Sequence, residues 1–256
     1  DGGIYRVRVT NDFGFADSDP ATLIVIPPPA QVTVNVDFNA TDGTLAAYSG
    51  IAAAPDLGAT WNGFAVGAAA DSPLIGSVTS DALVTSFGLP TPVTVSLGNF
   101  RPYEADDKLA GLAPNLMSDF VYQPNLGPGG PDGTFTINNL DPWLTYDVYL
   151  YGQNGGHAGA VMIFTIGGVS QTVANAGNGI TTFTAGVNYV VFTGLVPDES
   201  GMISGTFNSG KPGDNAAFTG LQILQHGPSD PPLIATQPAS QKALEGGTVT
   251  LSVSAT

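Results

Sequence analysis

The sequence predicts an all-β protein built around a central antiparallel β-sandwich of the jelly-roll type. Three observations lead to this prediction. Glycine and proline are abundant, at 34 and 20 of 256 residues, and both favour turns. Several segments alternate apolar and polar side chains with the period of two that marks a half-buried strand. A helical pattern occurs only at residues 107–113, where one or two turns are expected to end at Pro114.

Composition excludes several classes of function. Hydrophobic residues make up 43% of the chain, which is enough for a packed core. The net charge of −15 repels phosphate backbones and anionic lipids, so we expect no nucleic-acid partner. No apolar run approaches the roughly 18 residues of a membrane span, so no membrane insertion is expected. The absence of cysteine excludes disulfides, thiolate metal sites and a cysteine nucleophile.

The strand pattern is clearest at residues 31–38, where Val34, Val36 and Phe38 point to one side and Thr33, Asn35 and Asp37 to the other. Residues 145–151 form a second strong strand. If Tyr146, Val148 and Leu150 face the core, then Asp147, Tyr149 and Tyr151 face outward. Further strands are predicted at 92–97, 134–137, 161–166, 187–193, 202–207 and 217–224.

Both ends of the chain resemble pieces of immunoglobulin-like domains. In the first residues, Tyr5 stands at the tyrosine-corner position, Val7 stands where the family has a cysteine, and 11–14 form a hairpin turn. Residues 237–253 are similar to the opening strands of such a domain, with Val253 at the other cysteine position. This resemblance implies tandem bacterial immunoglobulin-like domains, each truncated, at 1–28 and 229–256. An alternative is that the two pieces pair into one domain.

The stretch between them, residues 29–228, resembles the galactose-binding-like or malectin-like jelly rolls of bacterial surface and polysaccharide-processing proteins. The similarity lies in three short segments, 34–38, 140–151 and 218–223. Thr219 stands where the family often has asparagine. The resemblance implies a secreted or cell-surface protein whose neighbours in the same chain are immunoglobulin-like domains.

A sugar site needs aromatic faces for stacking and amide or carboxylate groups for the hydroxyls. The residues that meet this description are Trp61, Asn62, Trp143, Asp147, Tyr149, Tyr151, Asn154 and His157. The alternative is that these aromatic rings pack beneath loops, as large aromatic side chains often do.

Calcium is the one expected cofactor, in a structural role, because it binds carboxylate oxygens in loops. Asp37 with Asp42, and Asp132 with Asp141, are the candidate ligands. The competing interpretation is that these aspartates form turns; residues 131–133, for example, read as a turn first of all.

These features predict a non-catalytic carbohydrate-binding or adhesion module, with a polysaccharide or cell-surface glycan as its partner. The alternative is a structural spacer between immunoglobulin-like domains. A polysaccharide-degrading enzyme has the least support. The chain has three glutamates, at 104, 199 and 245, no evident carboxylate pair in a cleft and no nucleophile elbow.

Overall fold

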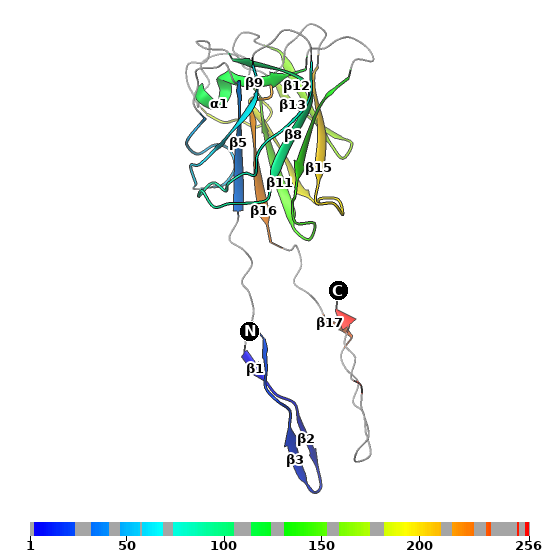
Figure 1. Ribbon diagram of the computed structural model, residues 1–256. Coiled ribbons are helices and arrows are strands. Elements are labelled where there is room, and N and C mark those ends of the chain that lie inside the picture. Colours follow the sequence, from blue (N-terminus) through cyan, green and yellow to red (C-terminus); the bar gives the residue numbers. More distant parts are fainter. Residues whose placement is uncertain are drawn as a thin grey trace. The chain divides into compact units, whose positions relative to one another are not determined.

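The computed structural model describes residues 3–23, 32–40, 47–56, 58–68, 74–104, 114–123, 131–152, 159–174, 182–210, 217–227, 234–236, 250 and 254–255. The chain divides into two compact units, Asp1–Ala30 and Gln31–Thr256. Strands dominate the described residues (Figure 1), which confirms the all-β prediction.

The first unit is a pair of two-stranded ribbons. β1 (Gly3–Tyr5) pairs with β4 (Ala21–Leu23), and β2 (Arg8–Asn11) pairs with β3 (Gly14–Asp17). The predicted turn at 11–14 is therefore confirmed. In the second unit, β17 (Ile234–Thr236) and β18 (Ser254–Ala255) form a further short pair. Nothing in these contacts tests the resemblance of either end to an immunoglobulin-like domain, which stays a prediction.

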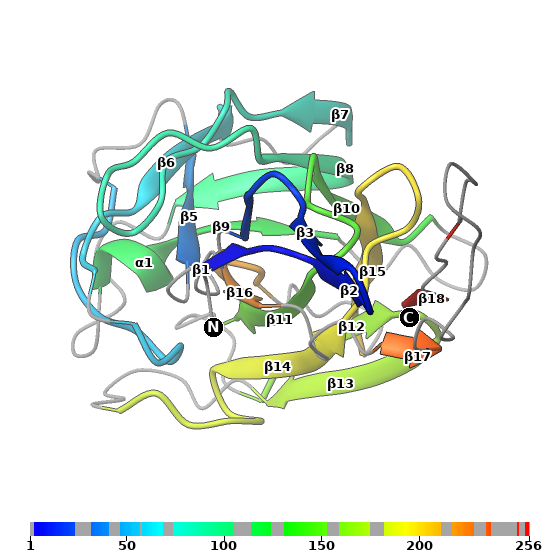
Figure 2. The ribbon, with the colours of Figure 1, turned by 90° about the horizontal axis from the view of Figure 1, so that it is seen from below.

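The centre of the second unit is a sandwich of two sheets, which face each other in the view of Figure 2. The larger sheet has the order β13 (Val169–Ala174), β12 (Val161–Ile166), β15 (Ile203–Ser209), β10 (Gly133–Asn138), β8 (Thr94–Glu104) and β7 (Ile75–Thr79), and β9 (Asp119–Tyr122) also pairs with β8. The smaller sheet has the order β14 (Tyr189–Leu195), β11 (Thr145–Tyr151), β16 (Gly220–His226), β5 (Val32–Ala40) and β6 (Asn62–Gly67). All these pairings are antiparallel except β5 with β6, which is parallel.

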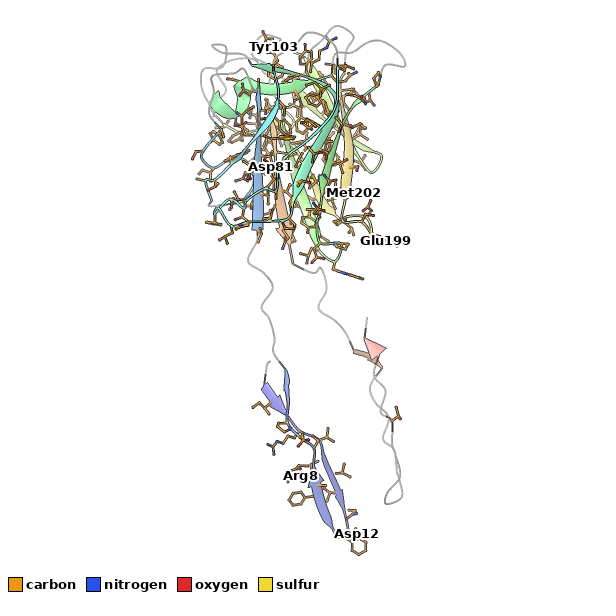
Figure 3. All side chains as sticks on the ribbon, in the orientation of Figure 1. Arg8, Asp12, Asp81, Tyr103, Glu199 and Met202 are labelled. Atoms are coloured by element: carbon orange, nitrogen blue, oxygen red, sulfur yellow. The ribbon has the colours of Figure 1, made fainter. Side chains whose placement is uncertain are left out.

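Apolar side chains fill the space between the sheets (Figure 3). At the centre, the ring of Phe218 makes edge-on contacts with four other phenylalanines. Their ring centroids lie 4.8 to 5.7 Å from its own, and they are Phe38, Phe135, Phe164 and Phe207. Aromatic pairs favour this geometry because the positive edge of one ring meets the negative face of another.

The predicted strands are present, and four strands were not predicted. β6, β7 and β13 carry glycine, serine or alanine at two or more positions, and β9 is only four residues long and buried throughout, so none of the four shows a long alternating apolar pattern. Two of them, β6 and β7, are the edge strands of their sheets on one side of the sandwich.

The helix prediction differs from the structure. Residues 107–113 lie outside the described residues, whereas α1 (Pro114–Ser118) begins at the proline that was expected to end a helix. Proline is favoured in the first turn of a helix because the amide hydrogen that it lacks has no partner there. No helix among the described residues is long and apolar enough to cross a membrane.

Candidate functional site

The outer face of the smaller sheet is covered rather than exposed. Residues 47–56 and 58–61, here called the cover segment, lie over it together with α1. Trp61, Leu116, Met117 and Tyr151 form a buried cluster there. As a result, Asn35 and Asp37, which the alternating pattern places on the outer face, are fully buried.

This cover accounts for two of the aromatic residues predicted to bind sugar. Trp61 is 6% exposed and Tyr151 is 0% exposed, and their ring centroids lie 6.2 Å apart. Trp61 also contacts Tyr48 and donates its indole N–H to the carbonyl of Gly50 at 2.9 Å. The prediction of an outward surface at Tyr151 is therefore wrong, because the cover segment packs directly on that ring.

A chain of buried hydrogen bonds fixes the cover segment to the sheet. The Tyr151 hydroxyl donates to Gln222 Oε1 and accepts the amide of Ala53 at 2.8 Å. Gln222 Oε1 also accepts the amide of Ala54 at 3.0 Å. Burial raises the pKa of Tyr151 well above its usual range, so the hydroxyl keeps its proton.

The other outward positions of β11 are half-buried. The Tyr149 ring lies 6.0 Å from that of Tyr189. Asp147 accepts the amide of Gly194 at 2.8 Å, and its second oxygen lies 3.0 Å from Nε2 of His226. Asp147 and Tyr149 thus sit together on one strand, and the Asp147 carboxylate already has partners within the protein.

Trp143 differs from the other predicted aromatic residues because it is 85% exposed. Its turn is well held. Asp141 Oδ1 accepts the amide of Trp143 at 2.9 Å, and the Asp141 amide donates to the Tyr146 hydroxyl at 3.0 Å. The indole ring is therefore presented to solvent from an ordered turn, away from the Trp61 cluster.

Asn62 has a structural role. Its amide nitrogen donates to the carbonyls of Asn35 and Val84, both at 2.8 Å, and its oxygen accepts the amide of Val84 at 2.8 Å. These bonds connect β6 to the chain that follows β7. They also shape one end of a recess.

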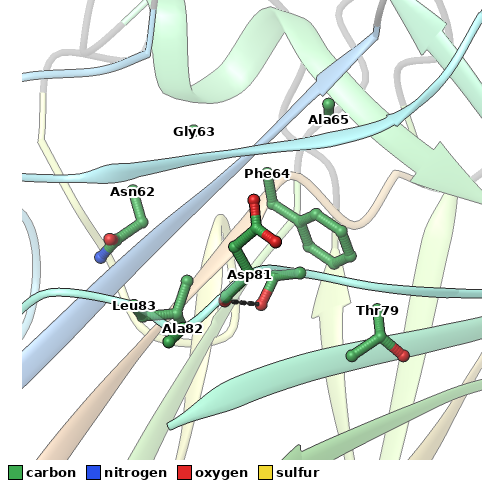
Figure 4. A pocket seen from close by; sticks show the side chains of 9 residues that line it. Asn62, Gly63, Phe64, Ala65, Thr79, Asp81, Ala82 and Leu83 are labelled. Carbon is green, nitrogen blue, oxygen red and sulfur yellow. Dashed lines mark hydrogen bonds between the residues drawn. The ribbon is translucent and has the colours of Figure 1, made fainter. Parts of the chain in front are cut away.

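The recess lies where the two sheets end in β6 and β7 and has a volume of about 320 Å³ (Figure 4). It is lined by residues 62–65 of β6 and by residues 79–83. Phe64 and Leu83 are buried and supply apolar surface. Asp81 is exposed, and Figure 4 shows its carboxylate pointing from the 79–83 segment toward β6.

The recess was not predicted from the sequence, apart from Asn62. Asp81 and Thr79 come from a segment without strong periodicity, and only the pairing of β7 with β8 brings that segment opposite β6. No motif in the sequence marks Asp81. The sequence did not predict the edge strands β6 and β7 either, so it gave no indication of a recess beside them.

The predicted calcium ligands are dispersed. Asp132 is exposed and accepts the Asn208 amide at 3.2 Å, and Asp141 holds the Trp143 turn. Both therefore form turn or strand-end contacts. Asp42 lies outside the described residues, as do the predicted sugar contacts Asn154 and His157. Among the described residues, no three acidic, histidine or cysteine side chains form a group that suits a metal ion.

Asp37 differs from the other predicted calcium ligands that the structure describes because its side chain is buried. It is 0% exposed, and so is Asp119 of β9. Burial, together with the negative charge of Asp119, raises the pKa of Asp37 to about 8 against the opposing hydrogen bonds from Tyr48 and Asn39. A carboxyl group in this environment needs a proton or a cation as a partner.

Comparisons with known proteins give little further information. No family model and no curated protein matches the chain. One solved structure, an exo-beta-1,3-galactanase from Phanerochaete chrysosporium with beta-1,3-galactotriose, is similar at 23% identity with a TM-score of 0.27. The match covers 57% of this chain and 32% of that one. A likeness at this level assigns neither fold nor function to the chain.

Proposed function

We propose that the central sandwich is a non-catalytic carbohydrate-binding module of a large secreted or cell-surface protein. The observation that carries the proposal is the recess between residues 62–65 and 79–83. It combines an apolar floor with an exposed carboxylate in a volume of about 320 Å³. Small-ligand sites are commonly concave and mostly apolar, with a few polar groups that fix orientation.

The recess has the chemistry that a sugar unit requires. Sugar hydroxyls donate hydrogen bonds, and the Asp81 carboxylate provides two acceptor oxygens. Phe64 and Leu83 offer apolar surface to the C–H groups of the sugar ring. Because β6 is an edge strand, one side of its backbone has no strand partner, so its N–H and C=O groups add donors and acceptors.

The net negative charge of the chain favours uncharged glycans over acidic ones as ligands. At a net charge of −15, the protein repels acidic polysaccharides at moderate salt. Neutral polysaccharides are therefore the preferred ligands. Of the residues that line the recess, Asp81 is the single carboxylate, whereas glycoside hydrolysis generally uses two carboxyl groups that flank the bond. This supports binding over cleavage.

The test is isothermal titration calorimetry of the 256-residue chain against a panel of soluble neutral polysaccharides, including β-1,3-galactan, xylan and glucomannan. Binding to a panel member should weaken roughly tenfold or more in Asp81→Asn, because a charged hydrogen-bond acceptor is lost. Glu199→Gln is the matched control. It removes the same charge from an exposed residue that Figure 3 shows well separated from Asp81, and it should bind like the wild type.

Three outcomes would contradict the proposal. If no panel member binds, the spacer role becomes the better explanation of the module. If a glycan binds equally well to Asp81→Asn and loses affinity in Trp143→Ala, the sugar contacts the exposed indole and the recess is the wrong site. Released reducing sugar in a purified sample would show that the module is catalytic.

A further inference from the structure

The two buried carboxylates of the sandwich lie outside the glycan recess and have no role in it. Asp37 is on β5 and Asp119 begins β9, and neither exposes any surface. These strands are far apart in the sequence but pack against each other. Burying an ionised carboxylate costs several kcal/mol unless a cation or proton compensates, so the burial of Asp37 beside a second carboxylate calls for an explanation.

The hydrogen bonds of Asp37 leave one of its oxygens available. Its Oδ2 accepts the backbone amide of Tyr48 at 2.8 Å. Its Oδ1 is fully buried and has no hydrogen-bond partner. Buried polar atoms in native proteins nearly always have a partner, so an orphaned acceptor suggests a bound group that supplies positive charge.

Asn39 links the two carboxylates. It lies two residues after Asp37 on the same face of β5, and its amide nitrogen donates to Asp119 Oδ2 at 3.2 Å. The side-chain oxygen of Asn39 extends toward β6, where a Cβ on Gly63 would come within 2.8 Å of it. Glycine at position 63 therefore leaves room for the Asn39 side chain beside the two aspartates.

We propose that Asp37 and Asp119 bind a divalent cation, with calcium as the best match, and that Asp37 Oδ1 is one of its ligands. The two carboxylates balance the charge of the ion. Calcium accepts six to eight oxygen ligands in flexible geometry, and backbone carbonyls and water commonly complete such a set. The sequence suggested Asp37 as a ligand, but its partner comes from β9, 82 positions later in the chain.

The site has a structural consequence. Tyr48, which bonds to Asp37, lies at the start of the cover segment and packs on Trp61. A cation at Asp37 and Asp119 would therefore fasten the cover segment, β5 and β9 to one another. This inference does not rest on the proposed glycan site, because neither aspartate lines the recess.

The first experiment measures the effect of calcium on stability. The 256-residue chain is stripped with EGTA and dialysed, and CaCl₂ is then titrated by calorimetry and in thermal unfolding. We expect saturable binding and a rise in Tm of roughly 5 °C or more at a hundredfold excess over Kd. Asp37→Asn and Asp119→Asn should lose the rise. Asp132→Asn, which removes an exposed carboxylate, should keep it.

A second measurement tests the location without relying on those variants. Terbium(III) replaces calcium in oxygen sites and emits when an excited aromatic ring lies nearby. The backbone amide of Tyr48 bonds to Asp37, and the Tyr48 ring centroid lies 5.2 Å from that of Trp61, so bound terbium should luminesce on excitation of these rings, and calcium should quench the signal by displacement. Trp61→Phe should dim the emission, while Trp143→Phe should leave it unchanged.

Three results would overturn the proposal. One is the absence of calorimetric binding and of a Tm shift in the wild type. Another is a calcium response that survives in both Asp37→Asn and Asp119→Asn while each variant keeps the wild-type circular dichroism spectrum. The third is a stability that depends on pH but is identical in calcium and EGTA, which would mean that the two carboxylates share only a proton.

Discussion

The side-chain amide of Gln222 donates a hydrogen bond to Asn35 Oδ1 at 2.8 Å across the β16–β5 pair, and both side chains are buried. Asn35 in turn donates to the carbonyl of Thr60 at 3.0 Å. Together with the bonds of Gln222 to Tyr151 and Ala54, this contact closes a polar network between the sheet and the cover segment. The network gives the buried side chains of Asn35, Tyr151 and Gln222 hydrogen-bond partners within the protein.

Gln222→Leu should destabilise the protein by about 3 kcal/mol or more, because it leaves several buried polar groups unpaired at once. Urea unfolding followed by circular dichroism measures the change. Gln225→Leu, at a half-buried glutamine on the same strand, should cost less than about 1 kcal/mol. Equal effects in the two variants would show that the network does not stabilise the fold.

Phe218→Ala should cost about 3 to 5 kcal/mol, since it leaves a cavity between four phenylalanine rings at the centre of the sandwich. Phe87→Ala removes the same ring from a position that is 65% exposed and should change the free energy of unfolding by about 0.5 kcal/mol or less. Chemical denaturation of both variants gives the comparison. A small effect of Phe218→Ala would indicate that the two sheets do not pack through this ring.

Gly201→Ala should destabilise more than Gly194→Ala. Both glycines have positive φ, +74° and +64°, so alanine is strained at either position. At Gly201, however, a Cβ would also collide with the carbonyl oxygen of Leu140, whereas at Gly194 it would meet no atom within 4 Å. The expected cost is about 1 kcal/mol at Gly194 and clearly more at Gly201. Thermal unfolding of the two variants tests the order, and the reverse order would place the β10–β11 turn elsewhere.

The two tryptophans should differ in fluorescence. Trp143 is 85% exposed and Trp61 is 6% exposed. Trp143→Phe, which retains Trp61, should therefore emit at shorter wavelength and resist acrylamide quenching. Trp61→Phe, which retains Trp143, should emit at longer wavelength and be quenched readily. Similar quenching of the two variants would contradict the burial of Trp61 between the cover segment and the smaller sheet.

In the first unit, the ion pair of Arg8 and Asp17 should be detectable by titration of Asp17. The Arg8 guanidinium, whose Nε lies 2.6 Å from Asp17 Oδ1, lowers the pKa of Asp17. Because the ionised carboxyl is the favoured form, the pair's contribution to the hairpin is present above the ordinary aspartate pKa and is lost as pH falls through the lowered value. An NMR titration should show that the pKa of Asp17 is higher in Arg8→Gln than in the wild type. It should also rise in the wild type in about 1 M salt, because salt screens the charge of Arg8. No rise in Arg8→Gln would exclude the ion pair in solution.

The alternating pattern was sufficient to predict much of the fold. The side-chain period of two in β5 and β11 reports directly which residues face the core, and Val36, Val148 and Leu150 are all buried there. The short strands β6 and β7 escaped detection because glycine and serine leave little apolar signal. Their position at the sheet edges explains that composition, since an edge strand packs on fewer neighbours.

The sequence by itself determined the all-β class, the inner faces of the main strands and the turns that separate them, because these depend on local propensity and on the side-chain period. The tertiary structure alone decided what covers the outer face of the smaller sheet. Tyr151 and Asp37 look like surface residues in the pattern, but the cover segment, to which Trp61 itself belongs, buries them. It also decided that Asp37 meets Asp119 and that Asp81 faces β6. These contacts depend on how separate strands pack in space, which no local pattern of side chains encodes.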